Sequence, residues 1–408
     1  MKYKWRLVAS LLFILNILVY AVFSGTENIG VNVGIAVLWG EPFENVVSIW
    51  NVEQVLSVAQ EKNGQSKTVD QYINELVAEM SVEQKLAQMM ILTNEEDMIA
   101  PNLKNYQPGG IILFSKDFSG KTAEQIGEKI KGLQEDMAIP LFVGVDEEGG
   151  NVSRVAEMQG EDIPVFQSAR QLYEIGGISA VYDDTLTKTQ FLGSMGINLN
   201  FAPVADVVME KASYMYERSA SGKPEEVADY VETVVEIMER EHMTCCLKHF
   251  PGYGENANTH YLYTVDRKEL SAYRDIDFIP FERGIAAGAD MVMVSHIVME
   301  AVDKEKPASL SPAVHTLLRD ELGFEGVIMA DDLNMQAVLS RMALEDAAAE
   351  ALISGNDMIF SADFKITMQG CQKAVEEGRL FVQQIDDAVT RILRMKAEQG
   401  LLTVPERN

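Results

Sequence analysis

Several short apolar runs in the sequence end in acidic, basic and histidine side chains. Carboxylates and histidines together suit general acid–base catalysis and attack by a carboxylate nucleophile, the combination that hydrolyses glycosidic bonds. A single acidic residue after an apolar run is often only the N-cap of the next helix, so the hypothesis depends on several groups meeting in one place. The groups are Asp146-Glu147-Glu148, Asn198 with Asn200 and Asp206, Lys248-His249, Ser295-His296 and Asp331-Asp332.

The apolar runs themselves predict eight β-strands. Each run is nearly continuous rather than alternating, which is typical of strands buried on both faces. Amphipathic segments such as 121–136, 224–241, 278–287 and 341–354 lie between the runs and predict helices. The predicted strands are Gln88–Thr93, Gly110–Ser115, Leu141–Asp146, Gly196–Val207, Met243–Phe250, Asp290–His296, Gly326–Asp331 and Asp357–Ser361.

This alternation predicts an α/β fold, a single (β/α)8 TIM-type barrel. A doubly wound sheet is the alternative, but it is less favoured because no glycine-rich dinucleotide-binding turn occurs. The carboxyl ends of barrel strands share one rim, so the polar groups should converge there on a sugar-like substrate. Two helix starts fit: Ser311 before Pro312, and a capping box from Ser81 to Gln84.

Composition excludes some classes of function. The formal net charge is −28, which argues against a nucleic-acid partner because phosphates would be repelled. The chain has five histidines and only three cysteines, Cys245, Cys246 and Cys371, at spacings that do not suit a zinc site or a disulfide framework. We expect the cysteines to be small core residues, and we expect neither a metal nor a cofactor.

The amino terminus resembles a membrane-targeting segment. Lys2, Lys4 and Arg6 precede an apolar stretch from Leu7 to Phe23. This pattern predicts an uncleaved signal anchor or a cleaved signal peptide over residues 1–24, with the following chain outside the cytoplasm. Residues 25–67 read as a linker, and residues 68–402 as the catalytic barrel. The oligomeric state is open.

Five motifs, in order, resemble glycoside hydrolase family 3, in particular its single-barrel bacterial β-N-acetylglucosaminidases. The resemblance covers roughly residues 70–400. It implies a retaining, exo-acting enzyme that removes terminal β-linked N-acetylglucosamine from glycans, with cell-wall fragments as the expected source. The motifs are Pro108-Gly-Gly-Ile-Ile-Leu-Phe114, Val145-Asp-Glu-Glu-Gly-Gly150, Asn198-Leu-Asn-Phe-Ala-Pro-Val204, Lys248-His-Phe-Pro-Gly252 and Gly326-Val-Ile-Met-Ala-Asp-Asp-Leu333.

The resemblance also implies roles for individual residues. Asp331 matches the nucleophile that forms a glycosyl–enzyme intermediate, and Asp332 is expected to be a hydrogen-bonding neighbour. His260 matches the loop histidine that serves as general acid/base. The positions that match the residues gripping the terminal sugar are Asp146, Arg154, Arg218, Lys248 and His249.

The acid/base loop departs from the family pattern at one position. The family places an aspartate two residues before the histidine, whereas this chain has Asn258. An asparagine can orient the imidazole of His260 but supplies no charge, so we expect a weaker base. Glu255, in the same loop, is the candidate for supplying that charge. The segment after Arg218 also lacks the family's usual aromatic residue, which leaves substrate identity more open than reaction class.

Two other functions remain open from the sequence. One is a phosphorylase, or another β-glycosidase, on the same scaffold, because a neutral histidine acid/base does not repel phosphate as a carboxylate would. The other is a catalytically degenerate barrel that binds glycan without cleaving it, for which Asn258 is the support.

Overall fold

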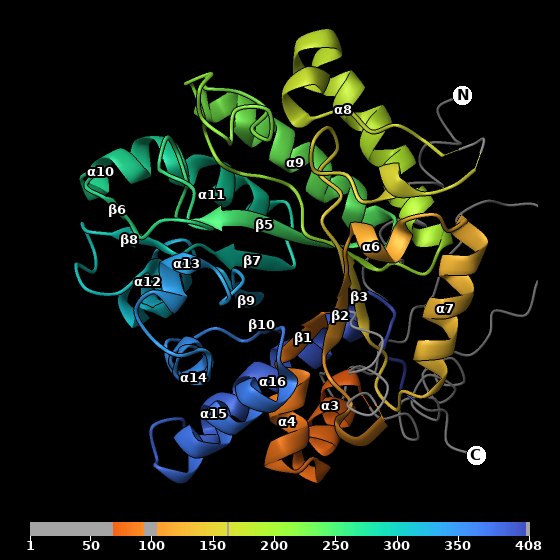
Figure 1. Ribbon diagram of the computed structural model, residues 1–408, viewed down its shortest axis with the longest axis vertical. Coiled ribbons are helices and arrows are strands. Elements are labelled where there is room, and N and C mark those ends of the chain that lie inside the picture. Colours follow the sequence, from red (N-terminus) through yellow and green to blue (C-terminus); the bar gives the residue numbers. More distant parts are fainter. Residues whose placement is uncertain (1–67, 94–103, 161–162, 405–408) are drawn as a thin grey trace, which may run out of the picture. The chain divides into compact units, whose positions relative to one another are not determined.

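The computed structural model describes residues 68–93, 104–160 and 163–404. Their main feature is a single eight-stranded parallel sheet in the order β10-β1-β2-β3-β4-β5-β7-β9 (Figure 1). The strands are β1 (Met90–Thr93), β2 (Gly110–Leu113), β3 (Phe142–Val145), β4 (Leu199–Asn200), β5 (Thr244–Phe250), β7 (Met291–Val294), β9 (Val327–Ala330) and β10 (Ile359–Ser361).

The sheet curls until its first and last strands almost meet. The carbonyl of Ile328 in β9 accepts hydrogen bonds from the amides of Asp357 (2.7 Å) and Met358 (3.1 Å), just before β10. The amide of Ala330 donates to the carbonyl of Met358 at 3.2 Å. The sheet is therefore a nearly closed barrel, and the carboxyl ends of its strands form one rim.

Helices follow most strands and lie around the outside of the barrel (Figure 1). The helices α9 and α11 pack on β5, α14 packs on β10, and α16 packs on β9 and on the two helices that precede the barrel. The helices are α3 (Val69–Glu79), α4 (Val82–Gln88), α6 (Ser115–Phe118), α7 (Ala123–Glu135), α8 (Ala169–Ser194), α9 (Pro224–Arg240), α10 (Leu270–Ala272), α11 (Phe278–Ala286), α12 (Pro312–Thr316), α13 (Gln336–Leu339), α14 (Leu344–Ile353), α15 (Phe364–Glu376) and α16 (Val382–Glu398).

Smaller elements shape the rim. A short parallel pair joins β6 (Thr264–Asp266) to β8 (Ile297–Met299), so the loops after β5 and β7 are held together. Short 3₁₀ and π segments complete the chain: η1 (Val155–Glu157), η2 (Tyr273–Asp277), η3 (Ala308–Leu310) and η4 (Leu317–Glu321).

The predicted barrel is confirmed in its strands and in the helices that flank them. Both helix starts form as expected: the Ser311 hydroxyl caps α12, and Ser81 and Gln84 form a capping box on α4. The main difference is the fourth strand, for which the ladder covers only Leu199–Asn200. Beyond it the chain still pairs irregularly with β5, because Pro203 has no N–H and can only accept, from Lys248.

The predicted anchor and linker lie in residues 1–67, outside the described residues. Among the residues that the structure does describe, no helix is both long and apolar enough to span a membrane. The connection after β1 includes residues 94–103, which are also outside the described part.

Candidate active site

A pocket of about 260 Å³ lies at the rim, where the carboxyl ends of the strands meet. Ile112, Met293 and Phe360, from β2, β7 and β10, supply an apolar part of its wall. Seven of the eight site residues expected from the sequence line this pocket: Asp146, Arg154, Arg218, Lys248, His249, His260 and Asp331. The eighth, Asn258, lines a second pocket that adjoins it.

A buried carboxylate, Glu148, holds two cations of the site in place. Its Oε1 lies 2.7 Å from Lys248 Nζ. Arg218 donates to the same carboxylate through Nε and Nη2, at 2.8 Å each. Burial alone would raise the pKa of Glu148, but Arg218 and Lys248 outweigh it and hold this pKa far below its usual value. The carboxylate is therefore charged and fixes both cations at the rim.

Asp146 shares Lys248 with Glu148. Lys248 Nζ donates to Asp146 Oδ1 at 2.8 Å, and Arg154 Nη2 lies 3.5 Å from Asp146 Oδ2. Burial would lower the pKa of Lys248, yet Asp146 and Glu148 raise it, so the ammonium keeps its charge. Asp146 is only partly buried and lines the pocket, where a carboxylate can accept hydrogen bonds from sugar hydroxyls.

A second buried carboxylate, Asp206, orients His249. Its Oδ2 accepts from the backbone N–H of His249 at 3.1 Å and from ring Nδ1 at 2.8 Å. The other ring nitrogen, Nε2, lies 3.3 Å from Arg218 Nη2. Arginine can only donate, so Nε2 accepts and the proton resides on Nδ1. The ring is thus locked in one tautomer, with its Nε2 against Arg218.

The expected nucleophile, Asp331, follows β9 directly. Its Oδ1 accepts the backbone N–H of Asp332 at 2.8 Å, and its own N–H donates to the carbonyl of Val294. Burial would raise the pKa of Asp331; the nearby His296 and the Asp332 amide outweigh it, and this pKa lies below its usual value. The carboxyl is therefore ionised at neutral pH, as a nucleophile requires.

His296 fixes the peptide that follows Asp332. Its Nε2 lies 2.9 Å from the carbonyl oxygen of Asp332, and its Nδ1 lies 2.6 Å from the Ser309 hydroxyl. A carbonyl can only accept, so Nε2 carries a proton. Burial lowers the pKa of His296. Asp332 also lines the pocket, and its Oδ1 accepts from the backbone N–H and the Nδ2 of Asn334 at 2.9 and 2.8 Å.

The loop after β5 brings His260 to the pocket. Asn258 Oδ1 accepts from the backbone N–H of His260 at 2.9 Å and from ring Nδ1 at 2.7 Å. The backbone N–H identifies the Asn258 atom as oxygen, so ring Nδ1 must carry a proton. Nε2 is then the ring nitrogen that could exchange a proton with a bound molecule. Asn258 thus orients the imidazole as an aspartate would, without its charge.

The same loop is fastened at several points. The Tyr253 hydroxyl lies 2.6 Å from Thr259 Oγ1 and also accepts the Thr259 N–H. The carbonyls of Thr259 and His260 accept from the amides of Ala337 and Gln336, each at 3.2 Å. These contacts hold His260 against the chain that follows Asp331.

Glu255 does not contact the ring of His260, to which it was expected to supply a charge. Its Oε1 accepts the backbone N–H groups of Met209 (2.7 Å) and Glu210 (2.9 Å). No hydrogen bond or ion pair joins it to His260 in the described residues. Glu255 therefore fastens the loop after β5 to the loop after β4.

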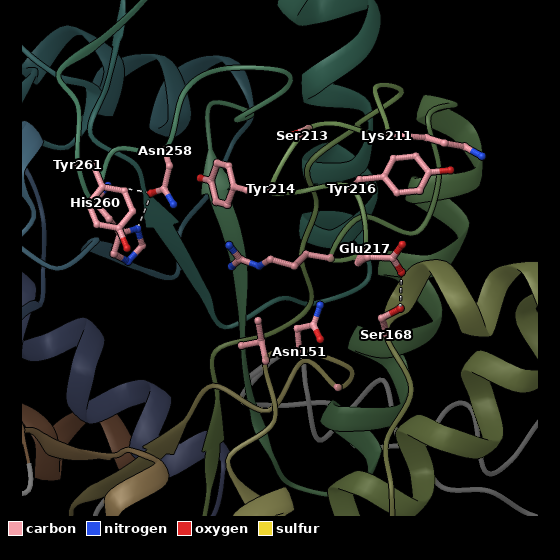
Figure 2. A pocket seen from close by; sticks show the side chains of 13 residues that line it. Asn151, Ser168, Lys211, Ser213, Tyr214, Tyr216, Glu217, Asn258, His260 and Tyr261 are labelled. Carbon is pink, nitrogen blue, oxygen red and sulfur yellow. Dashed lines mark hydrogen bonds between the residues drawn. The ribbon is translucent and has the colours of Figure 1, made fainter.

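A second, larger pocket of about 470 Å³ adjoins the first and shares Val152, Arg218 and His260 with it. Figure 2 shows Asn258, His260 and Tyr261 at one side of this pocket and Tyr216, Glu217 and Ser168 at the other, with Tyr214 between them. His260 thus belongs to the walls of both pockets.

Sequence reasoning missed the importance of Glu148 and gave His296 no role. A signal for Glu148 was available: in an extended chain residues two apart point the same way, so Asp146 and Glu148 share a side while Glu147 faces the other. Indeed Glu147 accepts the backbone N–H groups of Arg154 and Val155. Asn198 and Asn200, at the fourth strand, bind backbone groups of the third strand and its loop instead of the pocket.

Within the described residues, no group of three or more histidine, cysteine, aspartate or glutamate side chains is arranged to hold a metal ion. The three cysteines are free and buried.

Residues 81–395 match the family described as "Glycosyl hydrolase family 3 N terminal domain". The chain belongs to glycoside hydrolase family 3. It is therefore a glycoside hydrolase, which acts on a carbohydrate substrate. Among curated relatives, it is 33% identical over 233 residues to a β-hexosaminidase of Xylella fastidiosa strain M12, covering 56% of this chain and 68% of that protein. It is 30% identical over 267 residues to a β-hexosaminidase of Xanthomonas campestris pv. campestris strain B100, covering 64% and 80%.

Solved structures of the family are similar. A family 3 β-N-acetylglucosaminidase from Paenibacillus sp. str. FPU-7 superposes with a TM-score of 0.74 at 27% identity; the match covers 79% of this chain and 63% of that one. A β-N-acetylhexosaminidase from Beutenbergia cavernae DSM 12333 gives a TM-score of 0.70 at 28% identity, covering 78% and 99%.

Proposed function

We propose that this enzyme is a retaining, exo-acting β-N-acetylglucosaminidase that removes terminal β-linked N-acetylglucosamine. The observation that carries the proposal is the single pocket that holds an ionised Asp331, an oriented His260 and the cation network built on Glu148. The names of the similar β-hexosaminidases and β-N-acetylglucosaminidases support the choice of sugar.

In this proposal Asp331 attacks the anomeric carbon and forms a covalent glycosyl–enzyme intermediate. His260 donates its Nε2 proton to the departing glycosidic oxygen and then takes a proton from the water that hydrolyses the intermediate. Asn258 holds the ring in both steps, because it accepts from Nδ1–H whether or not Nε2 is protonated. Its lack of charge gives the imidazolium less support than an aspartate would give.

The remaining site residues hold the sugar. Asp146 and Lys248 present an acceptor and a donor to neighbouring hydroxyls, and His249, which Asp206 orients, holds Arg218 through its Nε2. Arg154 adds a further donor beside Asp146. Since Glu148 fixes Lys248 and Arg218 before substrate arrives, little ordering is needed on binding.

The experiment is hydrolysis of p-nitrophenyl N-acetyl-β-glucosaminide by the wild type, Asp331→Asn and Asp332→Asn. Loss of about 10³-fold or more in kcat is expected for the first variant, because the nucleophile is gone. The second is the matched control: it changes the adjacent carboxylate, which lines the same pocket but is held by Asn334, and it should lose far less. Equal activity in all three proteins would remove Asp331 from the mechanism.

Phosphorolysis is the second candidate function. The observation in its favour is that His260 is held by the neutral Asn258 amide, so no carboxylate at the acid/base position repels phosphate. Adding inorganic phosphate to the assay separates the two. A hydrolase releases N-acetylglucosamine at a rate that phosphate does not change, whereas a phosphorylase forms the sugar 1-phosphate. If neither activity is found with any N-acetylglucosaminide, the enzyme acts on a different sugar or the barrel binds glycan without cleaving it.

We also propose that the enzyme works outside the cytoplasm, tethered by residues 1–24, where cell-wall glycans are the available substrate. The support is the sequence, in which Lys2, Lys4 and Arg6 precede an apolar stretch. Fractionation of cells that express the full chain or a variant lacking residues 1–24 tests it. Membrane recovery of both proteins would refute the tether.

A further inference from the structure

The larger pocket lies next to His260, the proposed general acid/base. It shares His260 and Arg218 with the pocket that contains Asp331, and its volume, about 470 Å³, is nearly twice that of the other, about 260 Å³. A general acid must reach the glycosidic oxygen, which links the sugar being transferred to the group that leaves. The sugar occupies the pocket of Asp331, so the leaving group must lie on the other side of His260.

The walls of this larger pocket suit a sugar chain. Three tyrosines, Tyr214, Tyr216 and Tyr261, supply aromatic surface with polar tips, and Asn151 and Ser213 add groups that can bind hydroxyls. Tyr261 directly follows His260, and 75% of its surface is exposed before any ligand binds. In Figure 2 it stands at the end of the pocket beside His260.

The two sides of the pocket are also tied together. One side comes from residues 211–218, after β4, and the other from residues 258–261, after β5. Glu255 joins these two loops through the amides of Met209 and Glu210. On the first side, Arg170 lies over the Tyr216 ring at 4.2 Å and donates from Nε to its carbonyl. The pocket is thus formed in advance of substrate.

We infer that this pocket is the leaving-group subsite and that it takes an oligosaccharide of more than one sugar ring, with Tyr261 as the residue that holds the first of those rings. The inference rests on the proposed glycosidase function. The size of the pocket calls for more than one ring, and the exposed face of Tyr261 is placed to cover the ring next to the bond that His260 cleaves.

The test compares three probes on the full-length enzyme: the β-fluoride of N-acetylglucosamine, and the β-1,4-linked disaccharide and trisaccharide of N-acetylglucosamine. Fluoride leaves without filling the larger pocket. For the wild type, we expect kcat/KM to rise about tenfold from the disaccharide to the trisaccharide. In Tyr261→Ala, the ratio of kcat/KM for the trisaccharide to that for the fluoride should fall about tenfold. Leu262→Ala is the matched control, since Leu262 is exposed on the same loop but does not line the pocket.

The possible outcomes distinguish failure of the proposed subsite from failure of the proposed glycosidase function. Equal kcat/KM for disaccharide and trisaccharide, or an unchanged ratio in Tyr261→Ala, would overturn the subsite while leaving the glycosidase in place. An equal fall in Leu262→Ala would overturn the role of Tyr261. A wild type that does not hydrolyse the fluoride would overturn the proposed function itself, and the subsite with it.

Discussion

Replacing Glu148 with glutamine should both destabilise the barrel and disable the site. Glu148 makes three short contacts, to Lys248 at 2.7 Å and to Arg218 at 2.8 Å twice, and its side chain is only 5% exposed. The amide that replaces the carboxylate would keep its shape but leave the buried Lys248 and the partly buried Arg218 short of one negative charge. Breaking a buried ion pair costs about 3–5 kcal/mol of the free energy of unfolding.

That cost can be converted into a melting temperature. An unfolding entropy of about 2.1 cal/mol/K per residue, over the roughly 340 residues from Gln65 to Asn408, gives about 0.7 kcal/mol/K. The Tm of Glu148→Gln should therefore fall by about 4–7 °C. Since Lys248 and Arg218 lose their fixed positions, kcat/KM should fall by about 10²-fold or more. Thermal melting monitored by circular dichroism, with Glu157→Gln as an exposed control in the same loop, measures the stability loss.

The loss of stability in Glu148→Gln should also depend on pH. The pKa of Glu148 is lower in the folded protein than its ordinary value of 4.5, so its charge stabilises the fold above that value. This contribution is lost as pH falls below 4.5 toward the folded-state pKa. The difference in Tm between wild type and Glu148→Gln should thus be largest near neutral pH and shrink in acid. A constant difference, or none, would refute the account of Glu148 as a charged hub.

Three further predictions concern groups elsewhere in the fold. Lys396 is fully buried with Gln88 Oε1 as its hydrogen-bond acceptor at 3.1 Å, and burial lowers its pKa to about 7. Because the unfolded chain binds this proton more tightly, the free energy of unfolding should rise from pH 7 toward 10. Lys396→Met should stabilise the fold by about 1–4 kcal/mol at pH 7 in urea unfolding, and a destabilised variant would contradict this. Asn258→Asp should raise kcat/KM about tenfold above pH 7, because a carboxylate favours the protonated His260 that the first step needs. If the variant and the wild type have the same dependence of kcat/KM on pH, residue 258 acts only by orienting the His260 ring. Glu255→Gln should keep most activity, because an amide oxygen can still accept both backbone N–H groups. Glu255→Ala should lose about tenfold in kcat/KM. An equal loss in both variants would mean that the enzyme needs the charge of Glu255 and not only its hydrogen bonds.

The sequence predicts the barrel because its determinants are local. Continuous apolar runs, capping residues such as Ser81 and Ser311, and amphipathic segments each act within a few residues. The rim follows from topology, since parallel strands bring their carboxyl ends together whatever lies between them. Seven of the expected site residues accordingly reach one pocket.

Partners across the chain could not be read in the same way. Glu148 binds Arg218, which lies 70 residues further along the chain. Glu255 binds backbone groups of Met209 and Glu210, although His260 is closer to it in the sequence. Such contacts depend on how loops from different strands cross the rim, which no local pattern encodes. The end of the fourth strand was missed for a related reason: its length is set by how Pro203 meets β5, not by its apolar composition.

The most direct test of the central claim is to trap the covalent intermediate. The full-length enzyme is incubated with a 5-fluoro derivative of the β-fluoride of N-acetylglucosamine, which slows breakdown of the glycosyl–enzyme, and is then digested for peptide mass spectrometry. The account predicts one sugar per chain, on the peptide that contains Asp331, and no label in Asp331→Asn. A label on any other residue, or turnover with no label at all, would contradict Asp331 as the nucleophile.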